Sequence, residues 1–173
     1  MPRKAAFSRV FVRHYGAIVR FVERRVDDPE LARDIAGECF EIAWRKFDVD
    51  APFGVAWLFR TARNLTGNAY RRRTRDSAMS EELHRGSVRV TADDGLRECD
   101  DAMDLARALA TLSWSDQEIL QLAYWDDLGA EEIADVLGIT AGTARTRLSR
   151  ARNRLRDALE APQPAHPKVR SAS

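Results

Sequence analysis

Cysteine and histidine are scarce in this chain of 173 residues. The two cysteines, Cys39 and Cys99, lie far apart and outside any C-x-x-C pattern, and only three histidines are present. This spacing argues against a disulfide framework and against a structural zinc site. We therefore expect reduced thiols, no bound metal and no cofactor.

The sequence also lacks a long uncharged hydrophobic run. Its longest, 51–59, has nine residues, whereas a membrane-spanning helix needs about 20. The basic N-terminal stretch 1–16 never develops the apolar centre of a signal peptide. We expect a cytoplasmic protein without membrane insertion.

The chain also has almost no net charge, because its formal charge is only +1. Its acidic and basic residues are nevertheless strongly segregated along the sequence. Between Ser113 and Ala144 there are seven acidic residues and no lysine or arginine, whereas between Arg145 and Arg156 there are six arginines and no acid. A solvated helix face usually mixes the two signs in i,i+4 pairs. The arginine run therefore favours an anionic partner over a surface helix that is merely solvated.

Residues 129–156 predict two helices joined by a tight turn. Gly138 stands where a first helix would end, and Thr140 is a good N-cap for a second. One face of that second helix is apolar, with Ala144, Leu148, Ala151, Leu155 and Leu159. Thr143, Thr146, Arg150 and Asn153 occupy the opposite face. This arrangement is typical of a helix-turn-helix that reads the major groove of DNA.

The N-terminal part predicts two amphipathic helices, over 5–26 and 29–47. The second begins at Asp28-Pro29-Glu30, which supplies an acidic cap and proline at the first helical position. An inner stripe is formed by Leu31, Ile35, Cys39 and Ile42. A second row holds Phe40, Trp44 and Phe47, and the pattern leaves open whether these rings pack within the domain or face a partner.

A third helix is expected over 53–75, with Val55, Leu58, Ala62, Leu65 and Ala69 on its buried side. Its exposed side carries Trp57, Arg60, Arg63 and Asn64, and it ends in the basic stretch 70–75. Aromatic rings interleaved with arginines and an amide are typical of single-stranded nucleic-acid binding. The alternative for Trp57 is a place in the core.

The remaining segments predict an acidic linker over 77–101, a helix from about Met103, and a further helix started by a capping box at Ser115–Glu118. The proline-rich tail 161–173 has no periodicity and is expected to be disordered. The sequence thus predicts an all-α protein of two small helical domains, 5–76 and 102–160.

Taken together, these segments resemble the extracytoplasmic-function (ECF) group of bacterial sigma-70-type RNA polymerase sigma factors. DIAGECFEIAW (34–44) resembles region 2.2, WLFRTARNLTGNAYRRR (57–73) resembles regions 2.3 and 2.4, and 112–155 resembles region 4. The resemblance implies a non-enzymatic initiation factor without catalytic residues. Its implied partners are core RNA polymerase, through the β′ clamp helices and the β flap, promoter DNA as duplex and single strand, and an anti-sigma factor.

The resemblance also assigns roles to residues. Binding of the −35 duplex would fall to Thr143, Arg145, Thr146, Arg147, Ser149 and Arg150. Capture of the melted −10 strand would fall to Trp57, Arg60, Arg63, Asn64, Arg71, Arg72 and Arg73, with Asn64 at the pocket for a flipped base. Core polymerase would be bound by Asp34, Glu38, Glu41, Trp44 and Arg45. The chain departs from the common family pattern at Gly37, Thr61, Gly67 and Asn68.

The sequence leaves two alternative functions open. A helix-turn-helix repressor or activator would keep the C-terminal half and use the first 75 residues for sensing or dimerisation, but the array of Trp57, Asn64 and 71–73 argues against it. A hydrolase using His14, Glu23, Asp34 or Glu38 is the weaker alternative, because neither metal-ligand spacing nor a nucleophile with a base is present.

Overall fold

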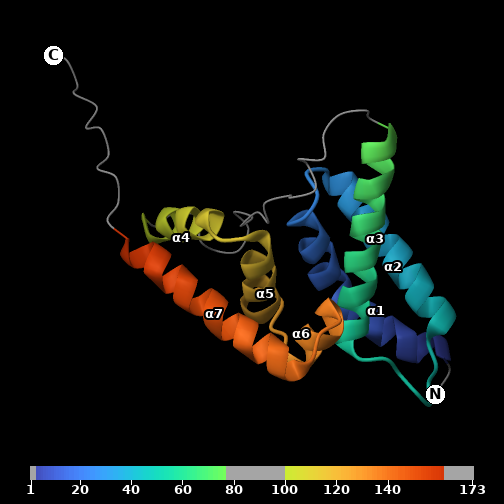
Figure 1. The fold of residues 1–173 in the computed structure, drawn as a ribbon. Coiled ribbons are helices and arrows are strands. Elements are labelled where there is room, and N and C mark those ends of the chain that lie inside the picture. The colour runs from blue at the N-terminus through green and yellow to red at the C-terminus, as the bar shows by residue number, and fades with distance from the viewer. Residues whose placement is uncertain (1–2, 77–99, 162–173) are drawn as a thin grey trace.

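The computed structural model describes residues 3–76 and 100–161, and the side chains of 3–72 and 103–161 (Figure 1). These residues form seven α-helices and no strand, which confirms the all-α prediction. The helices are α1 (Arg3–Glu23), α2 (Pro29–Lys46), α3 (Val55–Asp76), α4 (Asp100–Thr111), α5 (Trp114–Tyr124), α6 (Ala130–Leu137) and α7 (Ala141–Glu160). The predicted linker and tail lie almost entirely outside the described residues.

Helices α1, α2 and α3 pack against one another as the N-terminal half of the molecule. The start of α2 is the one that the sequence predicts, because the Asp28 side chain accepts hydrogen bonds from the backbone N–H groups of Glu30 (2.9 Å) and Leu31 (3.3 Å). Pro29 follows at the first helical position, where no N–H is needed. This fixed start sets which face of α2 turns inward.

The aromatic row of α2 is divided between core and surface. Phe40 and Phe47 are buried, whereas Trp44 keeps 37% of its surface exposed. The Phe7 ring of α1 makes edge contacts with all three, and its centroid lies 5.1 Å from that of Trp44. Packing inside the N-terminal half therefore accounts for two of these rings, and Trp44 remains accessible.

The predicted capping box at Ser115–Glu118 is wrong. The N-cap of α5 is Ser113, whose side chain accepts the Asp116 backbone N–H at 3.2 Å and donates to the Asp116 carboxylate at 2.8 Å. The pattern Ser113-x-x-Asp116 has the same spacing as the predicted box. The Glu118 side chain, which the box would have turned back to the helix start, instead points across to α3.

The helix-turn-helix is formed by α6 and α7 as predicted. Gly138 has φ 68° in the left-handed region that glycine tolerates, and the Thr140 side chain caps α7 by accepting the Thr143 N–H at 3.2 Å. The apolar face of α7 is buried at Ala144, Leu148 and Ala151. The prediction fails at Leu159, which lies one residue before the end of α7 and is 44% exposed.

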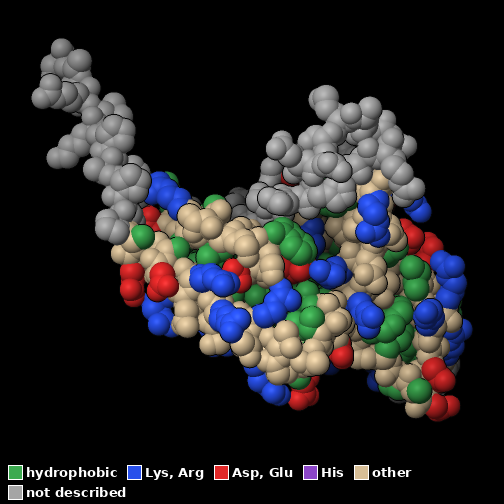
Figure 2. Space-filling view, in the orientation of Figure 1, with side chains coloured by type: hydrophobic (Ala, Val, Ile, Leu, Met, Phe, Trp, Pro, Cys, Tyr) green, Lys and Arg blue, Asp and Glu red, His purple; other side chains and the backbone are tan. Residues whose placement is uncertain are grey.

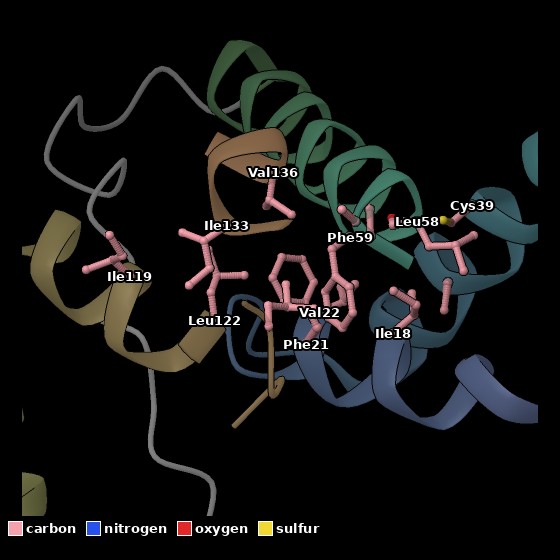
Figure 3. Packing of buried hydrophobic residues seen from close by; sticks show 14 of the residues in the cluster. Ile18, Phe21, Val22, Cys39, Leu58, Phe59, Ile119, Leu122, Ile133 and Val136 are labelled. Atoms are coloured by element: carbon pink, nitrogen blue, oxygen red, sulfur yellow. Dashed lines mark hydrogen bonds between the residues drawn. The ribbon is translucent and has the colours of Figure 1, made fainter. Parts of the chain in front are cut away.

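The two halves share one apolar core (Figure 3). Helix α6 packs on α3, which brings Ile133 and Val136 to the side of α3 that carries Phe59. Phe21 of α1 is fully buried at the same junction, with its ring 5.1 Å from that of Phe59. The helix-turn-helix is therefore docked on the N-terminal half in this structure.

Gly37 offers a test of the packing around α2. A Cβ built at this mid-helix position meets no atom within 4 Å, so Gly37→Ala should raise the free energy of unfolding by about 0.5–1 kcal/mol, the usual helix-propensity gain. Denaturant unfolding followed by circular dichroism measures the change. The matched control, Gly138→Ala, should lower stability by about 1–2 kcal/mol because its φ is positive. A loss of stability in Gly37→Ala would contradict the open space around it.

Candidate nucleic-acid interface

The outward side of α3 brings together four of the residues predicted to bind single-stranded DNA. Trp57, Arg60, Asn64 and Arg71 follow one another at spacings of three, four and seven residues, which places them on one side of an α-helix. Arg60, Asn64 and Arg71 are exposed, and Trp57 is half-buried. We call these four residues the α3 ridge.

Trp57 is neither a core tryptophan nor a freely exposed one. Its ring stacks on that of Phe53 with centroids 4.5 Å apart and an interplanar angle of 28°. The Thr61 hydroxyl donates a hydrogen bond of 2.8 Å to the Trp57 carbonyl. The ring is thus held in place on one face, which reduces the entropy lost when a nucleobase stacks on it.

The other predicted α3 residues lie off the ridge. Arg63 points to α5, where its Nε and Nη2 donate to the two carboxylate oxygens of Glu118 at 2.8 and 3.2 Å. Arg72 lines a groove against α2 together with Asp34 and Glu38. Arg73 lies in α3, and its side chain is outside the described residues. The structure therefore separates the predicted −10 set into a ridge and two flanks.

A cavity of about 270 Å³ lies between α3 and the start of α5. Arg63, Asn64 and Tyr70 line it from the α3 side, and Trp114 and Glu118 line it from the α5 side. The hydrogen bonds that Arg63 donates to Glu118 raise the pKa of Arg63, so this guanidinium remains charged. Residues of the C-terminal half therefore form the wall of the cavity opposite Asn64.

Five of the six residues predicted to read the −35 duplex are exposed on α7. Thr143, Arg145, Thr146, Ser149 and Arg150 are exposed. Arg145 approaches Glu131 of α6 at 3.7 Å, but both side chains remain mostly in solvent, where such a pair contributes little. Thr143 has a second role, because its hydroxyl lies 2.8 Å from that of the N-cap residue Thr140.

Two arginines of α7 hold the helix against α5. Arg147 donates a hydrogen bond to the Ser115 hydroxyl, and Arg154 Nη1 lies 2.9 and 2.8 Å from the two carboxylate oxygens of Asp116. The sequence predicts Arg147 as a DNA contact, but in this structure its guanidinium is directed into the domain. Arg154 nevertheless stays about half exposed, and Arg145, Arg150, Arg152 and Arg156 are exposed without a hydrogen bond or ion pair to the described residues of α5.

The predicted polymerase-binding residues form one outward stripe on α2. Asp34, Glu38, Glu41 and Arg45 are exposed and follow helical spacing, and Glu41 pairs with Arg45 at 3.6 Å. Trp44 lies beside them, with the Arg3 guanidinium 4.2 Å above its ring. The stripe combines carboxylates with an accessible ring held by a cation–π contact.

Sequence reasoning missed the charged groups that join the two halves. Arg24 at the end of α1 pairs with Asp126 after α5, with Nη2 and Oδ1 2.5 Å apart and both side chains 2% exposed or less. Arg25 Nη2 lies 3.9 Å from the Glu118 carboxylate. Burial lowers the pKa of Arg25 to about 10 and raises that of Asp126. No sequence signal identifies these partners, because 102 residues separate Arg24 from Asp126.

This charged junction is incompletely hydrogen-bonded. Among the described residues, Nε of Arg24, Nε and Nη2 of Arg25 and Oδ2 of Asp126 are buried without a hydrogen-bond partner. Each buried unsatisfied group costs about 1–3 kcal/mol. The junction therefore specifies how the halves dock more than it stabilises them.

Basic side chains are visible over both α3 and α7 in Figure 2. In the described ranges 3–76 and 100–161, no helix is long and apolar enough to span a membrane. The same ranges contain no group of three metal-ligating side chains that could hold an ion.

Comparison with known families gives two matches. Residues 10–76 match sigma-70 region 2, and residues 102–155 match sigma-70 region 4. The chain is 30% identical to the RNA polymerase sigma-E factor of Streptomyces avermitilis over 83% of its own length and 79% of that protein. It is 29% identical to the ECF RNA polymerase sigma factor SigL of Mycobacterium tuberculosis, over 91% of both chains.

Similar solved structures extend over both halves. The sigma factor RpoE of Bartonella quintana, crystallised with the anti-sigma factor NepR, matches with a TM-score of 0.66 and 26% identity, over 91% of this chain and 99% of that one. CnrH, in complex with the cytosolic domain of CnrY, matches with a TM-score of 0.57 and 28% identity over 92% and 91%. The all-α architecture is therefore shared with these proteins.

Proposed function

Because the chain belongs to the ECF group of the sigma-70 family of RNA polymerase sigma factors, we propose that it divides promoter recognition between its two halves. As a sigma factor it directs core RNA polymerase to promoters and initiates transcription, and its partners are core polymerase and promoter DNA. The proposed division is residues 5–76 for the −10 element and 102–160 for the −35 element, joined by the linker 77–101. We further propose a cytoplasmic location and no enzymatic activity of its own.

The α3 ridge carries this proposal. Trp57 offers a ring for stacking, Asn64 an amide for the edge of a flipped base, and Arg60 and Arg71 cations for the backbone. Base stacking on such a platform contributes about 1–3 kcal/mol per base, which is comparable with the cost of unstacking one base. The ridge would therefore hold a strand that has melted and would favour further melting.

Helix α7 would enter the major groove at the −35 element, with its exposed face toward base edges and phosphates. Six arginines, taken from the sequence, predict a salt slope near −5 for binding. Arg147 and Arg154 are engaged by α5, so the slope should be smaller in magnitude than the six arginines alone would give. Duplex affinity of this half alone should thus be modest and strongly salt-dependent.

The exposed stripe of α2 would bind core polymerase at its β′ clamp helices, with Asp34, Glu38, Glu41, Trp44 and Arg45 as contacts. Trp44 is an accessible aromatic ring with charged side chains around it. Protein interfaces commonly combine a central aromatic residue with a polar rim in this way. An anti-sigma factor is also a proposed partner, because the similar RpoE chain was crystallised with one.

The deciding experiment adds the purified chain to sigma-free core polymerase with a library of promoter fragments. We expect the chain to bind core and to yield specific run-off transcripts. A chain that binds duplex DNA alone, without core, would behave as a repressor or activator. Failure to bind core polymerase would overturn the proposal.

Arg150→Ala tests the docking of α7. Removal of a base or phosphate contact worth about 1–3 kcal/mol should lower −35-dependent transcription about 5- to 150-fold and reduce the salt slope by about one. Arg152→Ala is the matched control, because Arg152 is exposed but lies about 200° further round the helix. Unchanged transcription from a cognate promoter in Arg150→Ala would count against this docking.

A further inference from the structure

The contact between Arg63 and Glu118 joins the side of α3 proposed to bind DNA to the C-terminal half. Arg63 lies next to Asn64 of the α3 ridge, and its Nε and Nη2 donate to the two oxygens of one carboxylate at 2.8 and 3.2 Å. A bidentate arginine–carboxylate pair has the geometry that the same arginine would use for a phosphate. Glu118, only 2% exposed, thus stands where a DNA backbone would otherwise be bound.

The same docking covers the inner edge of the ridge. The cavity beside Asn64 is closed on its other side by Trp114 and Glu118 of α5. Helix α6 lies against α3, and Ile133 and Val136 reach the core near Phe59 (Figure 3). A strand that runs along α3 toward Arg63 would therefore meet the C-terminal half.

A second ion pair fixes this docking at a site away from the ridge. Arg24 and Asp126, 2.5 Å apart and buried, connect the end of α1 to the segment after α5. Because buried nitrogens of Arg24 and Arg25 and one oxygen of Asp126 lack partners, separation of the halves would return them to water. The ion pair thus fixes the geometry of the docked halves. Its unsatisfied buried groups lower the cost of separating them, so a binding partner can compete with the docking.

We infer that the docked arrangement is an autoinhibited state of the free chain, in which Glu118 competes with the −10 strand for Arg63. The inference rests on the proposed function of α3 and adds its regulation. Opening of the Arg63–Glu118 and Arg24–Asp126 pairs releases the C-terminal half and exposes the whole DNA side of α3. The free protein is therefore a weak binder of single-stranded promoter DNA until the halves separate.

Two isosteric variants of the full chain test this inference. Glu118→Gln removes the carboxylate that holds Arg63, and Asp126→Asn weakens the second pair without touching the ridge. For both we expect a larger radius of gyration by small-angle X-ray scattering and tighter binding of a fluorescent −10 oligonucleotide. The gain should be on the order of tenfold, as for a competent state that rises from about a tenth of the molecules to most of them.

The controls separate docking from charge and from the ridge itself. Glu131→Gln removes the same charge from an 84% exposed side chain whose ion-pair partner is Arg145 of α7, so it should leave both measurements at their wild-type values. Asn64→Ala combined with Glu118→Gln should lose oligonucleotide affinity while it keeps the larger radius. Unchanged helix content by circular dichroism verifies that each variant is folded.

The outcomes distinguish this inference from the proposed function. A wild-type radius and wild-type affinity in both variants would overturn autoinhibition, even if Asn64→Ala weakens binding. A larger radius without tighter binding would overturn it as well, because the docking would then not block DNA. If Asn64→Ala does not weaken oligonucleotide binding in the Glu118→Gln background, the proposed role of the ridge is contradicted instead.

Discussion

Replacement of Asn64 with alanine should lower transcription from a cognate promoter by about 5- to 150-fold, the loss of a base contact worth about 1–3 kcal/mol. Asn64 is exposed on α3, so the change should not affect folding, and alanine is the better helix former. Binding of core polymerase and of −35 duplex DNA should be unchanged. Run-off transcription and binding assays measure the three quantities.

A change in the DNA template tests whether the loss of transcription in Asn64→Ala arises at promoter opening. If Asn64 captures a flipped base, a template with a premelted −10 bubble should recover part of the activity, because unpairing no longer has to be driven by capture. Asn68→Ala is the control on the same helix, since it removes the same amide from a residue that lines the groove toward α2 and touches the ridge only by its hydrogen bond from Arg71. An equal defect in the two variants would argue against a specific pocket at Asn64.

Phe21→Ala should lower the free energy of unfolding by about 3–5 kcal/mol. The Phe21 side chain is fully buried, its ring contacts that of Phe59, and the Arg25 guanidinium lies 3.7 Å above its face. The variant loses transferred apolar area, an aromatic contact and a cation–π contact at once. Urea or guanidinium unfolding followed by circular dichroism measures the effect.

The control for Phe21 lies on the same helix. Val12 is 81% exposed, so Val12→Ala should change the unfolding free energy by less than about 0.5 kcal/mol. Since total stabilities of about 5–15 kcal/mol are usual, Phe21→Ala should also reduce the yield of folded protein. A cost below about 1 kcal/mol would contradict the placement of Phe21 at the centre of the shared core.

The helix starts and turns were predictable because their signals are local. Asp28 and Pro29 fix the beginning of α2, and Gly138 and Thr140 fix the turn before α7 through backbone groups within four residues. The start of α5 was placed two residues late, because Ser113 and Ser115 both head a plausible cap and only the packing of Glu118 distinguishes them.

The candidate site was predictable to the extent that it follows helical periodicity. Trp57, Arg60, Asn64 and Arg71 share a face of α3 in any helix that contains them, and the structure places them on one ridge. Helical periodicity does not predict that Arg63 turns toward Glu118 or that Arg147 turns toward Ser115. Their partners come from another helix, 55 and 32 residues away in the sequence.

The sequence by itself determined the seven-helix character of the described chain, its helix-turn-helix, its basic and aromatic α3 ridge and its resemblance to sigma factors. These depend on interactions between residues a few positions apart, which a sequence pattern records. The tertiary structure alone decided which charges face solvent and which are buried between the halves, with Arg24, Arg25, Arg63, Glu118 and Asp126 at the junction. Seven consecutive residues of α5, 116–122, are buried, because that helix is enclosed by others. A side chain's burial and its ion-pair partner depend on which helices meet in space, and no local pattern contains that information.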